Sequence, residues 1–92
     1  MRFEWDETKN LVNIQKHGID FLDVPVVFEN DMLIEVDKRF DYGEDRWIGI
    51  GLLSPGVVVV VWAEPQSDVI RIISTRRANR HERKKFEQYL SY

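Results

Sequence analysis

The middle of the chain alternates between short apolar runs and turn-forming segments. The apolar runs occupy residues 33–37, 46–53, 57–63 and 69–74, and the segments that join them read DKRFDYGED, SPG and EPQSD. Runs rich in β-branched and aromatic residues, bounded by Gly, Pro, Asp and Ser, are typical of strands in hairpins. Because these connections are too short for crossovers, we expect four sequential antiparallel strands. Residues 57–61 are apolar at every position, which predicts a central strand covered on both faces.

A first helix is indicated at residues 7–17, after a short strand or extended entry at residues 3–5. Asp6 is a suitable N-cap for this helix, and Gly18 is a suitable C-cap. The apolar side chains of the helix are expected to face the core: Leu11, Ile14 and Val12.

Two more helices are expected, one before the four strands in the chain and one after them. Residues 20–28 predict a short helix, in which Pro25 removes a backbone donor and should kink or shorten it. Residues 80–90 predict a C-terminal helix, because Asn79 followed three residues later by Glu82 is a capping-box start. The fold class is therefore α+β, with the N-terminal helices packed on one face of a four-stranded antiparallel sheet.

Alternation along the strand at residues 69–74 places its side chains on two faces. Ile70, Ile72 and Ser74 should share one face, and Arg71 should lie on the other. A long cationic side chain within a strand suits a sheet that has one covered and one open face.

The strand 46–53 contains two glycines, Gly49 and Gly51, on the same expected face. Their missing side chains either leave a shallow groove, where the backbone of a ligand could approach, or satisfy a need for strand curvature. Both interpretations are open from the sequence.

The segment IRIISTRRANRHER, residues 70–83, contains five arginines in fourteen positions. Arg76 and Arg77 are expected in the turn after the strand, and Arg80 and Arg83 in the first turns of the helix. Cations near the positive end of a helix dipole are slightly unfavourable, so another interaction should favour them. A polyanion such as RNA is the simplest candidate, because Arg side chains and helix N-termini bind phosphate.

Ninety-two residues make one domain, residues 1–92, with room for one modest core. The chain lacks cysteine and a signal-like apolar segment, and its longest apolar run is too short to span a bilayer, so we expect a soluble cytoplasmic protein without a membrane partner. Two histidines 64 positions apart match no ligand spacing, so neither a metal nor another cofactor is expected. Tyr92 is expected to have no function.

The net charge of −3 conceals a strong asymmetry. Residues 1–45 hold 5 Lys or Arg and 12 Asp or Glu, whereas residues 46–92 hold 8 and 4. A local basic surface matters more than the total charge, because phosphate binding depends on the field at one face.

Four stretches together resemble the BrnT family of bacterial type II toxins: FEWDETKN, KHGIDF, GEDRWIGIG and IRIISTRRANRHER. The resemblance covers nearly the whole chain. It implies a RelE-like ribonuclease fold and an RNA-cleaving toxin that blocks translation. It also implies a BrnA-like antitoxin with a ribbon-helix-helix domain, and an assembly with that antitoxin that is a heterotetramer or larger. Pro25 departs from this pattern, since a good helix former is expected there.

Metal-free RNA cleavage needs a base for the 2′-OH proton, an acid for the leaving 5′-oxygen and cations for the phosphate charge. Arg71, Arg76 and Arg77 are the predicted catalytic cations. For proton transfer we favour His17, since histidine exchanges protons most readily near neutral pH. The other candidates for proton transfer are His81, Lys16, Glu44 and Glu82, of which Glu82 already has a capping role. The predicted substrate-binding residues are Lys16, Arg46, Arg80 and Arg83.

The rival interpretation is a module without catalytic activity. A basic surface of this kind can also bind RNA without cleaving it, or meet an acidic partner protein. An enzyme would cleave RNA, an RNA-binding module would only shift it on a gel, and a protein-interaction module would do neither.

Overall fold

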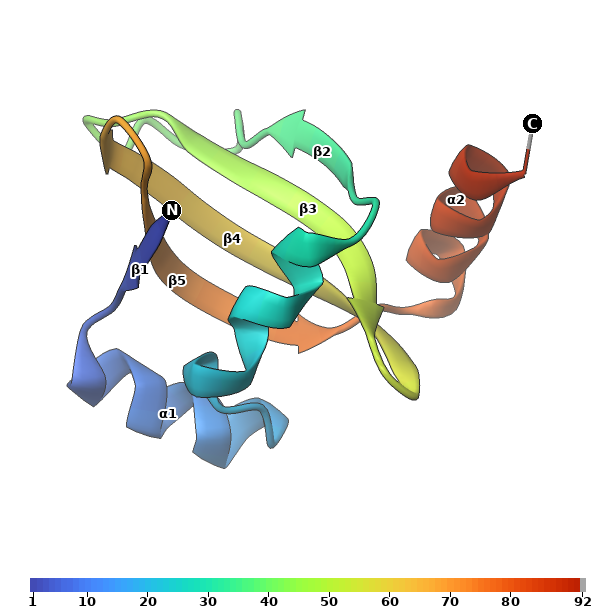
Figure 1. Cartoon of the computed structure of the whole chain (residues 1–92), viewed down its shortest axis with the longest axis horizontal. Helices are drawn as coiled ribbons and strands as arrows, with labels where there is room; N and C mark the ends of the chain where they lie inside the picture. The colour runs from blue at the N-terminus through green and yellow to red at the C-terminus, as the bar shows by residue number, and fades with distance from the viewer. Residues whose placement is uncertain (92) are drawn as a thin grey trace.

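Eight elements follow one another in the computed structural model, which describes residues 1–91 (Figure 1). They are β1 (Arg2–Glu4), α1 (Glu7–His17), the 3₁₀ helix η1 (Phe21–Glu29), β2 (Leu33–Val36), β3 (Arg46–Leu53), β4 (Gly56–Gln66), β5 (Val69–Arg77) and α2 (Arg80–Leu90). The expected helices and strands are therefore present at close to their expected positions. The expectation for Tyr92 falls outside the described residues.

The sheet has the strand order β1-β5-β4-β3-β2, and β2 to β5 pair antiparallel as expected. The predicted number of four strands is wrong, because β1 adds a fifth strand. It pairs parallel with β5, with Arg2 opposite Val69 and Glu4 opposite Arg71. The sheet is consequently mixed, and the N-terminal residues cover an edge of β5 that would otherwise expose unpaired backbone groups.

A bulge in β5 overturns the simple alternation expected there. Trp62 of β4 pairs with Ile72, but Val61 pairs with Ser74, so that Ile73 is the extra residue. Ile72 packs in the core, whereas Ser74 lies on the opposite face, because a bulge shifts the side-chain alternation by one position. The strand also continues to Arg77, so Arg76 and Arg77 lie in β5 and not in a turn.

The face that α1 turns inward is polar, contrary to expectation. Leu11 and Val12 are 61% and 48% exposed, while Asn10 and Asn13 are buried. The Asn13 side chain donates to the Thr75 carbonyl at 2.9 Å and accepts from the Thr75 N–H at 3.1 Å, as a neighbouring strand would. Asn13 thereby satisfies backbone groups at the edge of β5 beyond the end of β1, so a polar side chain occupies the inward face of α1.

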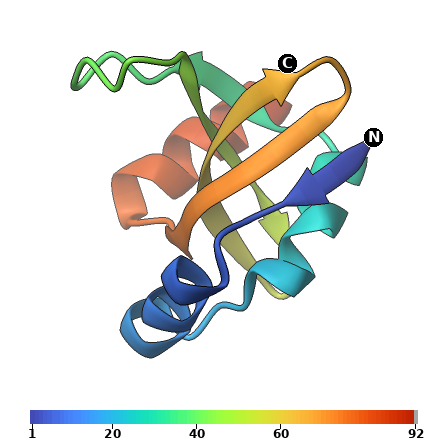
Figure 2. The ribbon, with the colours of Figure 1, turned by 90° about the vertical axis from the view of Figure 1, so that its left-hand side faces the viewer.

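The helix at Pro25 is a 3₁₀ helix along its whole length. Its buried side chains recur every third residue, which is the period of a 3₁₀ helix: Phe21, Val24 and Val27. These side chains join the main core on one face of the sheet, as expected for this helix, whereas α1 contributes no residue to that core and lies against the edge of β5. On the other face Phe86 of α2 packs on Ile50 and Val59, so β4 is covered from both sides (Figure 2).

The glycines of β3 leave no groove for a ligand. A Cβ at Gly49 would lie 2.5 Å from the Met32 side chain and 2.7 Å from Trp62, and one at Gly51 would lie 2.6 Å from Val27. The space above both glycines is filled by the core, so of the two interpretations left open by the sequence the ligand groove is wrong.

Gly51→Ala is therefore expected to destabilise the fold by about 1–3 kcal/mol, because it overpacks a filled core. Urea denaturation followed by Trp fluorescence would measure the loss. Gly56→Ala is the matched control, since its Cβ would meet only the flexible end of Arg77, at 2.9 Å. Equal stability of the two variants would contradict the packing argument.

Candidate RNA-binding cleft

Four polar residues of β3 and β5 project from the face of the sheet on which α2 lies. Arg46 and Arg71 both pair with Ala63 of β4, while Ser74 pairs with Val61 and Arg76 with Val59. Alternate residues of β4 point to the same side, so Arg71, Ser74 and Arg76 form one row along β5. Ser74 lies midway, about 7 Å along the strand from each arginine.

A cleft of about 240 Å³ lies on this face between the β2–β3 loop, residues 37–45, and α2. Figure 2 shows the loop (green) and α2 (red) projecting on the same side of the sheet. The lining residues come from the loop, the three central strands and the start of α2: Arg39, Ile48, Val59, Val61, Ser74, Arg76 and Glu82. The cleft therefore has an apolar floor and charged walls.

One wall is an ion pair between Arg76 and Glu82. The guanidinium donates two hydrogen bonds to the carboxylate, at 2.8 and 2.7 Å, and Glu82 also accepts the Asn79 N–H at 2.9 Å. The Arg76 guanidinium and the Asn79 N–H lower the pKa of Glu82 to about 2, against burial, which raises it. The pKa of Arg76 is raised in turn by the same carboxylate. Glu82 is thus a capping residue, as expected, and also orients Arg76.

The opposite wall is Arg39, which is not among the site residues predicted from the sequence. Its side chain donates twice to Asp37, each time at 2.9 Å, and Asp37 also accepts from Tyr42 at 3.1 Å. These bonds, led by that from Arg39, hold the pKa of the buried Asp37 at about 2. The available signal was an Asp within a turn-rich segment, two residues before an Arg, which is too common to identify a site.

A second group of cations lies beside the cleft. Glu44 accepts hydrogen bonds from Arg46 at 3.2 Å and from Arg71, and both partners, Arg71 first, lower its pKa. The guanidinium of Arg46 also lies 3.9 Å above the centre of the Tyr42 ring. Arg46 and Arg71 are therefore brought together, and Glu44 serves as their counter-ion.

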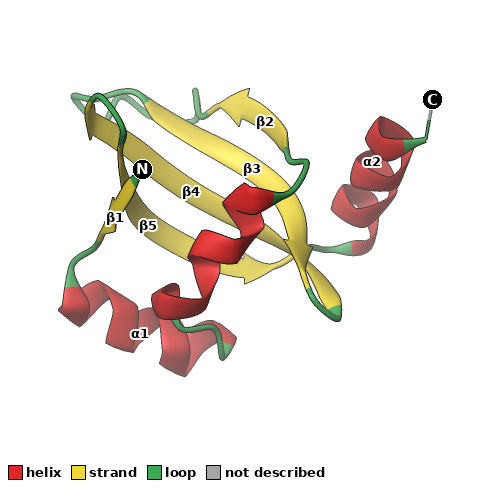
Figure 3. Cartoon of the chain, in the orientation of Figure 1, coloured by secondary structure: helices red, strands yellow, loops and turns green. Residues whose placement is uncertain are grey.

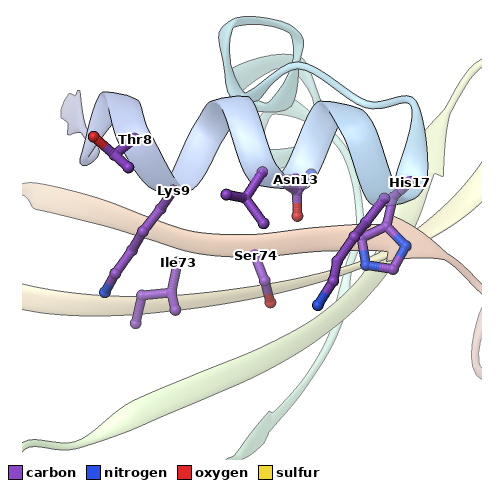
Figure 4. Close-up of a pocket in the computed structure, with 8 residues that line it drawn as sticks. Thr8, Lys9, Asn13, His17, Ile73 and Ser74 are labelled. Atoms are coloured by element: carbon purple, nitrogen blue, oxygen red, sulfur yellow. The ribbon is translucent and has the colours of Figure 1, made fainter.

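The predicted residues of α1, Lys16 and His17, lie in a second hollow, between α1 and β5. This hollow of about 270 Å³, the α1 hollow, is lined by Lys9, Lys16, His17 and Ser74 among others. Figure 4 shows the Lys9 side chain extending from the helix past the strand. The positions follow from helix geometry, because residues near the C-terminus of α1 reach β5 where Asn13 is bound to it. Since Ser74 lines both this hollow and the cleft, the two sites meet at Ser74.

Other predicted residues lie elsewhere. Arg77 pairs with the core residue Val58, so it lies on the opposite face from Arg71 and Arg76, in a hollow beside Gly18 and Asp23. The three arginines therefore do not surround one groove. Arg80, His81 and Arg83 lie on exposed parts of α2. The side chain of Arg83 is turned back onto the backbone, where it donates to the Ala78 carbonyl at 3.0 Å.

Within residues 1–91, no three His, Asp or Glu side chains come together as a metal site requires. The helices of the described region include none long and apolar enough to cross a membrane. Figure 3 shows that the helices α1, η1 and α2 extend over shorter distances than the long strands β3, β4 and β5.

The free energy of unfolding is expected to fall in acid as the carboxyls of Asp37 and Glu82 are protonated. Their folded pKa values of about 2 lie below the ordinary values of roughly 4, so the folded state binds fewer protons between these limits. The stabilisation is complete above about pH 4.5 and is lost as the pH approaches 2, at about 1–2 kcal/mol for each group. Urea titrations over this range should show a weaker pH dependence for Asp37→Asn than for Glu87→Gln, a control on the exposed side of α2. Equal dependence would exclude Asp37 as a source.

Comparison with known proteins agrees with this architecture. Residues 5–82 match the family described as ribonuclease toxin, BrnT, of type II toxin-antitoxin system. The crystal structure of the Brucella abortus ribonuclease toxin BrnT superposes with a TM-score of 0.69 and 30% identity, covering 87% of this chain and 99% of that chain. No curated protein matches the sequence. The chain therefore belongs to the BrnT family of ribonuclease toxins of type II toxin-antitoxin systems.

Proposed function

We propose that this toxin cleaves RNA without a metal ion at the junction of the cleft and the α1 hollow. The observation that carries the proposal is the position of Ser74, which lines both sites and lies in one row with Arg71 and Arg76. A strand of RNA crossing β5 at Ser74 would have cations on both sides of one phosphate. Arginine binds phosphate through paired N–H groups, and Arg76 is already oriented by Glu82.

The proposed chemistry is transfer of the phosphorus from one ribose oxygen to another. The 2′-oxygen attacks the adjacent phosphorus as His17 takes its proton, the bond to the 5′-oxygen breaks, and an acid protonates that oxygen. This leaves a 2′,3′-cyclic phosphate and a free 5′-hydroxyl. Arg71 and Arg76 stabilise the negative charge that grows on the phosphate oxygens.

Several cations are proposed to hold the rest of the RNA. Lys16 lies beside His17, and Arg46 lies beside Arg71, so both extend the row in which the phosphates would lie. Arg80 and Arg83 lie further away on α2 and are proposed to contact more distant phosphates. Arg77 lies on the other face, and we place it outside the cleft.

The cognate antitoxin that a type II toxin implies is proposed to be BrnA-like, with a ribbon-helix-helix domain. We infer that the assembly is a heterotetramer or larger and that the antitoxin covers the cleft. Covering it would remove the charged walls from water, so the affinity of the antitoxin would depend on the same residues that bind RNA. In this account the toxin has a RelE-like fold and blocks translation in the cytoplasm when the antitoxin is lost.

The test is incubation of purified protein with single-stranded RNA in the presence of EDTA. Cleavage with 2′,3′-cyclic phosphate ends is the expected result, together with arrest of a cell-free translation reaction. A shift of the RNA on a gel without cleavage would show a binding module instead, and neither effect would show that the surface serves a protein partner.

A further inference from the structure

We propose that Phe40 is a base-stacking residue, which binds a nucleobase of the RNA next to the cleft. The proposal rests on the proposed function, because it concerns the same RNA strand. It assigns a role to the β2–β3 loop beyond that of Arg39, and it makes this loop the part of the toxin that contacts bases.

The loop is fixed at its base and at its turn. The side chain of Asp37 is fully buried and accepts hydrogen bonds from Arg39 and Tyr42. At the turn, Asp41 accepts the Gly43 N–H at 3.0 Å, and Gly43 has the positive φ of 72° that suits glycine. Phe40 lies between these two anchors, so its backbone has a defined place near the cleft.

The side chain of Phe40 is an unusual one to leave in water. It is 71% exposed, and its ring contacts the ring of Tyr42 at 5.8 Å and 72°. This near-perpendicular contact leaves most of the Phe40 ring open to solvent. A large aromatic ring in water forgoes the stabilisation of burial, so a bound partner would recover it.

The surroundings of Phe40 favour a nucleobase as that partner. Lys38 and Arg39 precede it directly, and Arg39 is a wall of the cleft. Two of the loop carboxylates are already bound to arginines, Asp37 to Arg39 and Glu44 to Arg46 and Arg71. Cations that follow a nucleic-acid backbone, with an aromatic ring beside them, are the combination that binds single-stranded nucleic acid through phosphate contacts and stacking.

The geometry relates the ring to the reaction. The loop and α2 project on the same side of the sheet (Figure 2). Arg39 of the loop and Arg76 of β5 line the cleft together. A phosphate held between these arginines would place a neighbouring nucleotide at the loop. Stacking of its base on Phe40 would set which phosphate reaches Ser74, so Phe40 would affect where the RNA is cut as well as affinity.

Binding can be measured with a short single-stranded oligonucleotide of 2′-O-methyl ribose, which has no 2′-OH proton to lose. Phe40→Ala is expected to weaken its binding roughly 5- to 150-fold, the range for loss of one stacked base, while Phe40→Trp keeps the wild-type affinity or exceeds it. Leu22→Ala is the matched control, since Leu22 is 68% exposed on η1, across the sheet, and it should bind as wild type does. All four proteins should have the same thermal midpoint.

A series of oligonucleotides, each with one base removed, tests the contact directly. Removing one particular base should weaken wild-type binding but leave Phe40→Ala unaffected. If Phe40→Ala bound every oligonucleotide as wild type does while wild type cleaved RNA, Phe40 would have no such role and the proposed function would stand. If wild type neither bound nor cleaved RNA, both would fail. Loss of antitoxin binding alone in Phe40→Ala would show a protein contact and overturn the proposal.

Discussion

Replacing Arg71 or Arg76 with Ala is expected to slow RNA cleavage by roughly two to three orders of magnitude. This is the typical cost of removing one preorganised group that stabilises the charge of a transition state. Arg76 is held by two hydrogen bonds to Glu82 and Arg71 by Glu44, so neither guanidinium has to be reoriented when RNA binds. Single-turnover cleavage rates at saturating protein would measure the loss without the contribution of binding.

Arg77→Ala is the matched control for this experiment. It removes the same charge one residue away, but on the other face of the sheet, and is expected to keep the cleavage rate within a few-fold of wild type. The thermal midpoint separates function from folding. The Arg71 side chain is 37% exposed, so its loss should cost no more than about 1 kcal/mol of stability, whereas loss of Arg76, the main partner of Glu82, should cost about 1–2 kcal/mol. Equal slowing in all three variants would show that the cleft is not the site.

The parts of this fold that could be predicted from the sequence depend on short-range chemistry. Asp6 caps α1, Gly18 ends it with a φ of 71°, and Asn79 and Glu82 form the expected capping box. The antiparallel strands followed from turns too short for crossovers. Each of these features is decided within a few residues, so the local pattern is sufficient.

The features that could not be predicted depend on contacts between distant segments. Asn13 is buried because it binds Thr75, 62 residues away, and no local pattern shows that a polar side chain will face inward. The parallel pairing of β1 has the same origin. The bulge at Ile73 reversed the expected face of Ser74, because a single extra residue changes every side-chain direction after it.

The candidate site shows the same limit. Arg71 could be selected because it interrupts an apolar strand, and Arg46 was selected as a further cation. Their shared counter-ion Glu44 was among the candidates for proton transfer. Arg39 could not be selected, because its importance comes from the fold, which brings a loop residue opposite Arg76. Only the register of β5 shows that neighbouring residues, Arg76 and Arg77, serve different faces.

His17→Ala is expected to reduce the cleavage rate by roughly 10²- to 10⁴-fold, the usual contribution of a general acid or base. His17 lies at the C-terminal end of α1, in the hollow that also contains Ser74. The 2′-hydroxyl of an RNA bound at Ser74 would therefore lie close enough for His17 to take its proton. The side chain of His17 is exposed, and the structure should not depend on it.

His81→Ala is the matched control, because this second histidine is also exposed but lies on α2 and lines neither the cleft nor the α1 hollow. It should cleave RNA at close to the wild-type rate, and both variants should keep the wild-type thermal midpoint. Binding of the 2′-O-methyl oligonucleotide adds a second readout. A residue that only holds RNA would lose affinity, whereas a proton-transfer residue loses rate while affinity is kept. A His17→Ala protein with wild-type rate, or a slow His81→Ala protein, would place the proton transfer outside the α1 hollow.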